Sequence, residues 1–152
     1  MIKRLLVEEQ ETAKRIWELQ IPSYEVEANL INFFEIPPLR ETVEDLQKCG
    51  EIFYGLWMDD ELAGAISYKR EENTLDIHRM MVHPRHFRKG VASRLVEYVE
   101  QIEEGIEEIL VSTGSKNTPA VNLYKRYGFE PIGELEIAPG VKLMNFRKRL
   151  EK

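Results

Sequence analysis

The sequence predicts an α/β fold in a single domain, and three observations lead to this fold class. The chain has 152 residues, a length that suits one domain, so we expect one over residues 1–152. Hydrophobic residues make up 43% of the chain and charged residues 32%, which is typical of a globular protein with a buried core. The apolar residues recur with the period of helices in some stretches and with the period of strands in others.

Periodicity and stop signals divide the chain into successive elements. Pro22 interrupts the first helical pattern, and Thr42 followed by Asp45 has the form of an N-cap with a capping box. Asp59 and Asp60 separate two alternating runs, as in a hairpin turn. The expected elements are a strand at 2–7, helices at 11–20 and 25–34, an extended segment at 36–39, a helix from 42 to 50, strands at 52–58, 62–69 and 74–82, a helix at 90–104, a strand at 108–113, a helix capped at 117 or 118, and strands at 129–137 and 141–149.

Charge is unevenly distributed along the chain, whose net charge is −6. Residues 1–60 carry 6 Lys and Arg against 13 Asp and Glu, a balance of −7, whereas residues 61–152 carry 15 against 14, a balance of +1. An acidic first half gives no basis for nucleic-acid binding, so none is expected. The acidity, which includes Glu25 and Glu27, suits a cationic amine, although a solvated acidic surface explains it equally well.

The sequence gives no sign of a membrane span, of export or of a metal centre. The apolar runs fall short of the ~20 residues of a transmembrane helix, and the N-terminus lacks the apolar region of a signal peptide. The single cysteine, Cys49, excludes an internal disulfide, and the three histidines lack the spacing of metal ligands. We therefore expect a cytoplasmic protein with no membrane partner.

Residues 82–92 predict a phosphate-binding turn. The chain passes from a strand through the basic pair Arg88-Lys89 and Gly90 directly into an amphipathic helix. The first N–H groups of a helix have no partner within the helix, and the positive end of the helix dipole favours an anion. Gly90 allows a ligand to approach the backbone closely. The alternative is an ordinary strand-to-helix turn with basic residues on the surface.

Residues 117–129 form a second motif, Asn-Thr-Pro-Ala-Val-Asn-Leu-Tyr-Lys-Arg-Tyr-Gly-Phe. Asn117 or Thr118 is suited to cap a helix with Pro119 in its first turn. Tyr124 follows Asn117 by seven residues, or about two turns along the same face. Taken together and in this order, the two motifs resemble the acetyl-CoA-dependent N-acetyltransferase superfamily (GNAT). The resemblance extends over nearly the whole chain, with the closest match at residues 76–129.

The resemblance implies a mixed, mostly antiparallel sheet with helices on both faces, and an enzyme that uses acetyl-CoA to acetylate a primary amine. In the family pattern Arg/Gln-x-x-Gly-x-Gly/Ala, Gly90 and Ala92 fit, whereas Phe87 stands at the Arg/Gln position. Backbone amides of this turn would hold the pyrophosphate, and the end of the strand at 74–82 would pair with the pantetheine arm. The implied cofactor-binding residues are Met80, Met81, Val82, Arg88, Lys89, Gly90, Val91, Ala92, Ser93 and Asn117.

The resemblance also places Tyr124 beside the thioester sulfur. Amine attack on the thioester expels a thiolate that needs a proton, and a phenol, with an ordinary pKa of about 10, can supply it. Plain packing of a helix aromatic is the alternative for Tyr124. For the base that accepts the amine proton, His78 is the best-placed candidate, and Asp76 would orient it or act in its place. Water acting alone is an equal alternative.

Alternation along the strand at 74–82 predicts two faces. One face holds Leu75, Ile77, Arg79 and Met81, and the other holds Asp76, His78, Met80 and Val82. Two functions besides catalysis remain open: an acyl-CoA-binding regulatory module, and a protein-interaction module of the same fold. Tyr124 argues against the acyl-CoA-binding module, because a pure binder has no use for a phenol at the sulfur, and failure to bind CoA would favour the protein-interaction module. The amine acceptor, a small molecule or a protein amine, is not specified, and the resemblance admits a homodimer.

Overall fold

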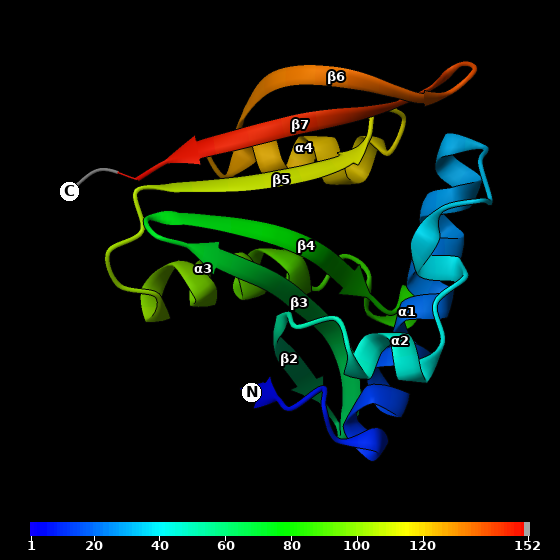
Figure 1. Cartoon of the computed structure of the whole chain (residues 1–152), viewed down its shortest axis with the longest axis vertical. Helices are drawn as coiled ribbons and strands as arrows, with labels where there is room; N and C mark the ends of the chain where they lie inside the picture. Colours follow the sequence, from blue (N-terminus) through cyan, green and yellow to red (C-terminus); the bar gives the residue numbers. More distant parts are fainter. Residues whose placement is uncertain (151–152) are drawn as a thin grey trace.

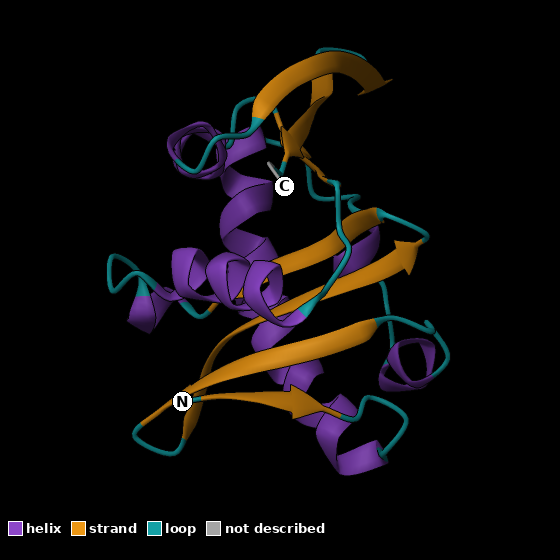
Figure 2. Cartoon of the chain, turned by 90° about the vertical axis from the view of Figure 1, so that its left-hand side faces the viewer, coloured by secondary structure: helices purple, strands orange, loops and turns teal. Residues whose placement is uncertain are grey.

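The structure, a computed structural model, describes residues 1–150 as a seven-stranded sheet with helices on both faces (Figures 1 and 2). The strand order is β1-β2-β3-β4-β5-β7-β6, and all neighbours are antiparallel except the parallel pair β4–β5. The expected mixed, mostly antiparallel α/β fold is thereby confirmed. The strands are β1 (Ile2–Leu5), β2 (Ile52–Met58), β3 (Glu61–Glu71), β4 (Thr74–Val82), β5 (Glu108–Gly114), β6 (Glu130–Ala138) and β7 (Val141–Arg149). The helices are α1 (Gln10–Ile31), α2 (Val43–Gln47), α3 (Val91–Ile102) and α4 (Thr118–Arg126), with short 3₁₀ turns η1 (Pro37–Leu39) and η2 (Pro84–His86).

The parallel strands β4 and β5 pair at one end only. Their register runs from Thr74 with Glu108 to Asp76 with Leu110, and the two strands then diverge toward α1, as Figure 1 shows. The sheet therefore consists of two halves, β1–β4 and β5–β7, joined at one end. Beyond Asp76 the edge of β4 that faces β5 has no strand partner within residues 1–150.

A single helix, α1, stands where two helices were expected, and that expectation was wrong. Pro22 lies inside α1, whose buried residues continue on both sides of it, from Leu19 to Ile31. A proline in a helix interior removes one hydrogen bond at a cost of about 3 kcal/mol. Burial of the apolar face against the sheet offsets that cost. Ile31 packs so closely on β5 that a Cβ at Gly114 would lie 2.6 Å from its Cγ2.

The two faces of the sheet have separate cores. On one face α3 and α4 pack over the sheet through Leu95, Val99 and Tyr124, and on the other α1 and α2 pack through Ile16 and Leu46. The start of α3 lies very close to β3, because a Cβ at Gly64 would be 2.5 Å from Val91 Cγ1 and 2.8 Å from the Met81 carbonyl oxygen. Glycine at position 64 therefore sets where α3 begins.

A β-bulge at His78 changes the predicted faces of β4. Ser67 pairs with Arg79 and the next residue of β3, Tyr68, pairs with Ile77, so His78 is an extra residue in β4. Such a residue shifts the alternation of side chains from that point on. Leu75 and Ile77 share one face, as predicted, and lie in the core under α3. Met81 and Arg79 were predicted on that face but lie on the opposite one, where Met81 is in the core under α1 and Arg79 binds Gln20 of α1.

Other local predictions are confirmed or corrected in small ways. Thr42 and Asp45 form the predicted capping box of α2, which ends at Gln47 rather than at Gly50. The Pro37-Pro38 segment was expected to be extended but forms the 3₁₀ turn η1, since the φ that proline fixes suits both conformations. Among the described residues, no helix combines the length and the apolar character that crossing a membrane would require.

Candidate functional site

The turn before α3 presents a row of unpaired backbone donors. Arg88 and Gly90 both have positive φ, +65° and +73°, and α3 begins at Val91. Within residues 1–150, the backbone N–H groups from Arg88 to Ser93 have no backbone carbonyl partner, and the first such bond into α3 runs from the Arg94 N–H to the Gly90 carbonyl at 3.1 Å. Adjacent unpaired N–H groups at a helix N-terminus suit an anion such as phosphate.

His86 connects the turn to β3 through its two ring nitrogens. Its Nε2 lies 3.0 Å from Glu61 Oε2 at the start of β3, and its Nδ1 lies 3.3 Å from Lys89 Nζ. His86 is buried, and its hydrogen bond, with the charge of Arg85, lowers the pKa of Glu61. His83 Nδ1 accepts the Arg85 N–H at 3.1 Å. Both histidines therefore support the turn, and Lys89, predicted to bind the cofactor, is turned partly toward His86.

Two side chains of α1 lie against the diverging edge of β4. Ser23 Oγ accepts the Val82 N–H at 3.1 Å. The Tyr24 hydroxyl lies within reach of the Met80 backbone N–H, and burial is the largest cause that raises the pKa of this phenol above its ordinary value. Sequence reasoning missed Ser23 and Tyr24, because no local pattern shows which strand a helix residue meets. The backbone donors of Met80 and Val82, predicted to bind the pantetheine arm, are thus within reach of groups from α1.

Asn117 begins α4, and it is joined to α1 through Glu27. Its Oδ1 accepts the Ala120 N–H at 3.4 Å, which is the predicted N-cap. Its Nδ2 donates to Glu27 Oε1 at 3.1 Å, and the Thr113 hydroxyl of β5 donates to the same oxygen at 3.0 Å. Glu27 thus links α1 to the start of α4 across the point where β4 and β5 have diverged.

Tyr124 lies almost fully buried on the inner face of α4. Its ring packs edge-on against Phe129, with centroids 5.4 Å apart, and at a tilt against Phe146, 5.7 Å away. Burial, and to a smaller degree the charge of Glu27, raises the pKa of Tyr124 above its ordinary value. The phenol therefore keeps its proton through the neutral range. The structure thus shows the packing of the ring, and the role of the hydroxyl as an acid stays a prediction.

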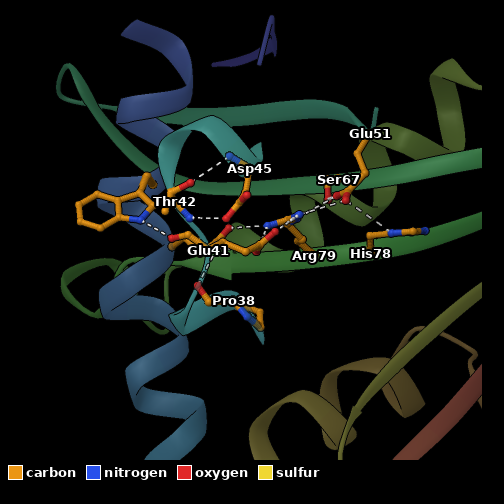
Figure 3. Close-up of polar contacts among 10 residues, drawn as sticks. Pro38, Glu41, Thr42, Asp45, Glu51, Ser67, His78 and Arg79 are labelled. Carbon is orange, nitrogen blue, oxygen red and sulfur yellow. Dashed lines mark hydrogen bonds and ion pairs between the residues drawn. The ribbon is translucent and has the colours of Figure 1, made fainter. Parts of the chain in front are cut away.

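His78 and Asp76 come together on β4, as the sequence predicted, but a third group joins them. His78 Nε2 lies 3.5 Å from Asp76 Oδ2. Its Nδ1 lies 3.6 Å from Glu51 Oε2, a contact that Figure 3 shows. A carboxylate therefore lies near each ring nitrogen, while about a third of the His78 side chain stays exposed.

Arg79, next to His78, is the centre of a buried polar cluster that sequence reasoning missed (Figure 3). Its guanidinium binds Glu51 and Glu41 through two hydrogen bonds each, at 2.6–3.1 Å, and Gln20 of α1 at 2.9 Å. Ser67 donates to Glu51 at 2.6 Å. Burial alone would raise the pKa of Glu51, but the hydrogen bonds from Arg79 and Ser67 and the charge of Arg79 outweigh it and lower that pKa. The signal in the sequence that could have revealed this cluster is Arg79 itself, a charged residue within an apolar strand.

A depression of about 320 Å³ lies beyond the end of α1. It is lined by residues from α1, from the segment between β5 and α4, and from the β6–β7 hairpin. These are Ile31, Ser115, Lys116, Gly140, Val141 and Lys142. Ile31 follows Glu27 by one helical turn on the same side of α1, so the depression adjoins the Glu27 site.

Two curated proteins are similar in sequence to this chain. A "UPF0157 protein YqkA" of Bacillus subtilis (strain 168) is 40% identical over 146 residues, which are 96% of this chain and 43% of that protein. A streptothricin acetyltransferase of Escherichia coli is 35% identical over 79 residues, 50% of this chain and 45% of that protein. The chain thus spans less than half the length of these curated relatives.

Solved structures share the fold at low sequence identity. The PaiA N-acetyltransferase of Thermoplasma acidophilum, solved in complex with coenzyme A, has 18% identity and a TM-score of 0.77, with 99% of this chain and 98% of that chain covered. An acetyltransferase of Thermus thermophilus has 18% identity and a TM-score of 0.78, with 99% and 97% covered. The protein-family model of the acetyltransferase (GNAT) family matches residues 13–129. That match includes β4, the turn before α3 and all of α4, so the chain belongs to the acetyltransferase (GNAT) family.

Proposed function

We propose that this chain binds acetyl-CoA and transfers its acetyl group to a primary amine. The observation that carries the proposal is the row of unpaired N–H groups from Arg88 to Ser93. This row follows β4, whose edge facing β5 has no strand partner beyond Asp76 among the described residues. Pyrophosphate oxygens fit the first feature and the amides of an extended arm fit the second. Family membership and the coenzyme A complex of the Thermoplasma relative support the same ligand.

The proposed cofactor contacts use mostly backbone. Amides of Arg88, Gly90, Ala92 and their neighbours up to Ser93 would hold the pyrophosphate, with Arg88 and Lys89 adding positive charge. The Phe87 side chain, which replaces the basic or amide residue of the family pattern, supplies no such charge. Met80, Met81 and Val82 would offer β4 backbone groups to the arm. Asn117 would contact the arm from α4 while its cap and its bond to Glu27 fix its orientation.

Tyr124 is the proposed acid for the leaving thiolate. The ring is held by Phe129 and Phe146, so the hydroxyl has a fixed position, which a proton donor needs. The raised pKa keeps the proton on the phenol at neutral pH. The Escherichia coli relative is named for the acetylation of streptothricin, and the Thermoplasma structure is named an N-acetyltransferase, which supports an amine nitrogen as the acceptor.

His78 and Asp76 stay the base proposed from the sequence, with water as the alternative. Their geometry supports them weakly, since both nitrogens of His78 face carboxylates. If His78 accepts the amine proton, His78→Ala should lower kcat/KM by roughly 100-fold. A change well below that would leave His78 as part of the bulge that shapes β4.

Two measurements test the proposed function. Isothermal calorimetry should show CoA binding by the wild type and its loss in Gly90→Glu, because an acidic side chain there would repel the pyrophosphate. Gly105→Glu is the matched control, because Gly105 also has a positive φ, +76°, but lies at the opposite end of α3. Equal loss in both variants, or in neither, would contradict the assignment of the turn.

The second measurement is thiol release from acetyl-CoA with a panel of amines. Release that depends on an amine supports a transferase. CoA binding without release for any amine would favour the acyl-CoA-binding module instead. Absence of CoA binding would favour a protein-interaction module.

A further inference from the structure

Glu27 carries a carboxylate without a counter-ion at the point where β4 and β5 have diverged. Both of its hydrogen bonds, from Thr113 and Asn117, reach Oε1. Oε2 has no hydrogen-bond partner among the described residues, and no Lys, Arg or His nitrogen of residues 1–150 lies within 4.0 Å of either oxygen. Among the described residues no side-chain oxygen or nitrogen without a partner is buried, so Oε2 is accessible and free to accept an N–H group from a ligand.

The groups around Glu27 are suited to an amine rather than to a metal. Two phenols, Tyr24 of α1 and Tyr124 of α4, are close enough for the charge of Glu27 to contribute to their raised pKa values, although burial is the larger cause for each. A single carboxylate with phenols and a hydroxyl offers hydrogen-bond acceptors for N–H groups. Ile31, one turn further along α1, lines the depression of about 320 Å³ together with Lys116 and Lys142, whereas Glu27 itself does not line it.

We infer that Glu27 is the residue that binds the amino group of the acceptor as an ammonium ion through Oε2 and then takes one of its protons. The inference rests on the proposed function, whose acid, Tyr124, lies on the neighbouring helix. It assigns to α1 the proton transfer for which the sequence offered His78 and Asp76 of β4 or water alone, and Glu27 replaces them as the proposed base. Glu25, two residues earlier, is exposed and serves as the contrast.

The reaction balances with these residues. One ammonium proton passes to the Glu27 carboxylate, and the free amine nitrogen forms a bond to the thioester carbonyl carbon. As the C–S bond breaks, the thiolate takes the Tyr124 proton. The nitrogen gives up its surplus proton to the phenolate, and Glu27 releases its proton to water. An ammonium ion and acetyl-CoA thus give an N-acetyl amide, CoA thiol and one proton.

Glu27→Gln is a sharp test, because the amide oxygen of Gln still accepts hydrogen bonds from Thr113 and Asn117. Only the charge and the basicity are removed. We expect KM for a cationic primary amine to rise at least about tenfold, with CoA affinity by calorimetry unchanged. Activity toward hydroxylamine, which is uncharged at neutral pH, should change little, because it brings no ammonium to bind. Glu25→Gln should behave as the wild type with both amines.

The outcomes separate the inference from the proposed function. An equal loss for both amines would make Glu27 a structural link between α1 and α4, and no loss for either would leave it without a part in the reaction. Either result overturns the inference while the wild type still releases thiol. Wild-type protein that fails to release thiol with any amine overturns the proposed function and with it the inference. Thermal unfolding of Glu27→Gln checks that the link itself survives.

Discussion

Tyr124 packs in the core and is the proposed acid, and the two roles can be separated by removing a single oxygen. Tyr124→Phe keeps the ring contacts with Phe129 and Phe146. Thermal stability and acetyl-CoA affinity should therefore change little. We expect kcat to fall by roughly 100-fold, because the lost proton donor acts mainly in the transition state. Steady-state kinetics with acetyl-CoA and a reactive amine measures this.

A second acyl donor distinguishes acid catalysis from packing at Tyr124. A thioester of a more acidic thiol expels its thiolate with less help, so the Tyr124→Phe variant should lose less activity with that donor. If both donors show the same loss, the phenol does not act as the acid. If neither shows a loss, Tyr124 is a packing residue only.

In the proposed site, Ser23 would compete with the cofactor for a backbone donor of β4. Its hydroxyl accepts the Val82 N–H, which the proposed site offers to the pantetheine arm. Ser23→Ala removes the competitor, so CoA should bind more tightly, by up to about tenfold for one neutral hydrogen bond. Calorimetry on this variant measures the change, and Thr12→Ala, on the same helix but far from β4, is the control. Weaker binding in Ser23→Ala would show that the hydroxyl itself contacts the cofactor.

The contacts that sequence reasoning missed share one property. Glu27 meets Thr113 and Asn117, which follow it by 86 and 90 residues, and Ser23 meets Val82, 59 residues away. No local period encodes such contacts. Asn117, Tyr124 and Gly90 could be proposed from the sequence because their proposed roles depend on spacing within one helix or one turn.

At the scale of elements, the position of the α3 N-terminus depends on Gly64 of β3. A Cβ there would lie 2.5 Å from Val91 Cγ1, so α3 must move if Gly64 becomes alanine. Overpacking of this kind costs about 1–3 kcal/mol. We expect Gly64→Ala to lower the free energy of unfolding by that amount in chemical denaturation. CoA affinity should fall as well, because the unpaired N–H groups move with α3.

Gly133→Ala is the matched control for Gly64→Ala, because a Cβ at Gly133 of β6 meets nothing within 4 Å. It should leave both stability and CoA affinity near the wild-type values. Normal CoA affinity in a destabilised Gly64→Ala variant would show that the turn adjusts independently of β3.

The order and type of the elements followed from the sequence, whereas their irregularities did not. Alternation predicted β4 at 74–82, with bounds that match the structure, but the extra residue at His78 leaves no mark on an alternating pattern. Pro22 predicted a helix end because local energetics disfavour it, and tertiary burial of Leu19 and Ile31 decided otherwise.

At the scale of the whole molecule, the hydrogen bonds of Arg79 on β4 join three parts of the chain: Gln20 of α1, Glu41 in the segment before α2, and Glu51 next to the start of β2. The lowered pKa of Glu51 makes the stability that these hydrogen bonds contribute depend on pH. A carboxyl whose pKa is lower in the folded state than in the unfolded state stabilises the fold above its unfolded pKa. That contribution is lost as the pH falls through the lower, folded-state pKa.

We therefore expect Glu51→Gln to reduce the free energy of unfolding at neutral pH by about 1.5–3 kcal/mol. Between about pH 5 and pH 3 the variant should lose less further stability than the wild type, because the wild type alone protonates Glu51 there. Urea titrations at several pH values measure both effects. Glu104→Gln, an exposed site after α3, is the control, and parallel pH curves for wild type and Glu51→Gln would contradict the linkage.

Hydrogen exchange offers a view of the site that needs no acceptor. The N–H groups from Arg88 to Ser93 lack backbone partners within the described chain, so their protons should exchange with water faster than those in the interior of α3. Phosphate oxygens that accept these bonds would slow the exchange. CoA should therefore protect these amides selectively, whereas a short acetyl thioester without a pyrophosphate should leave their exchange rates unchanged. The turn would then act as a built-in reporter of cofactor occupancy, usable before any acceptor is identified.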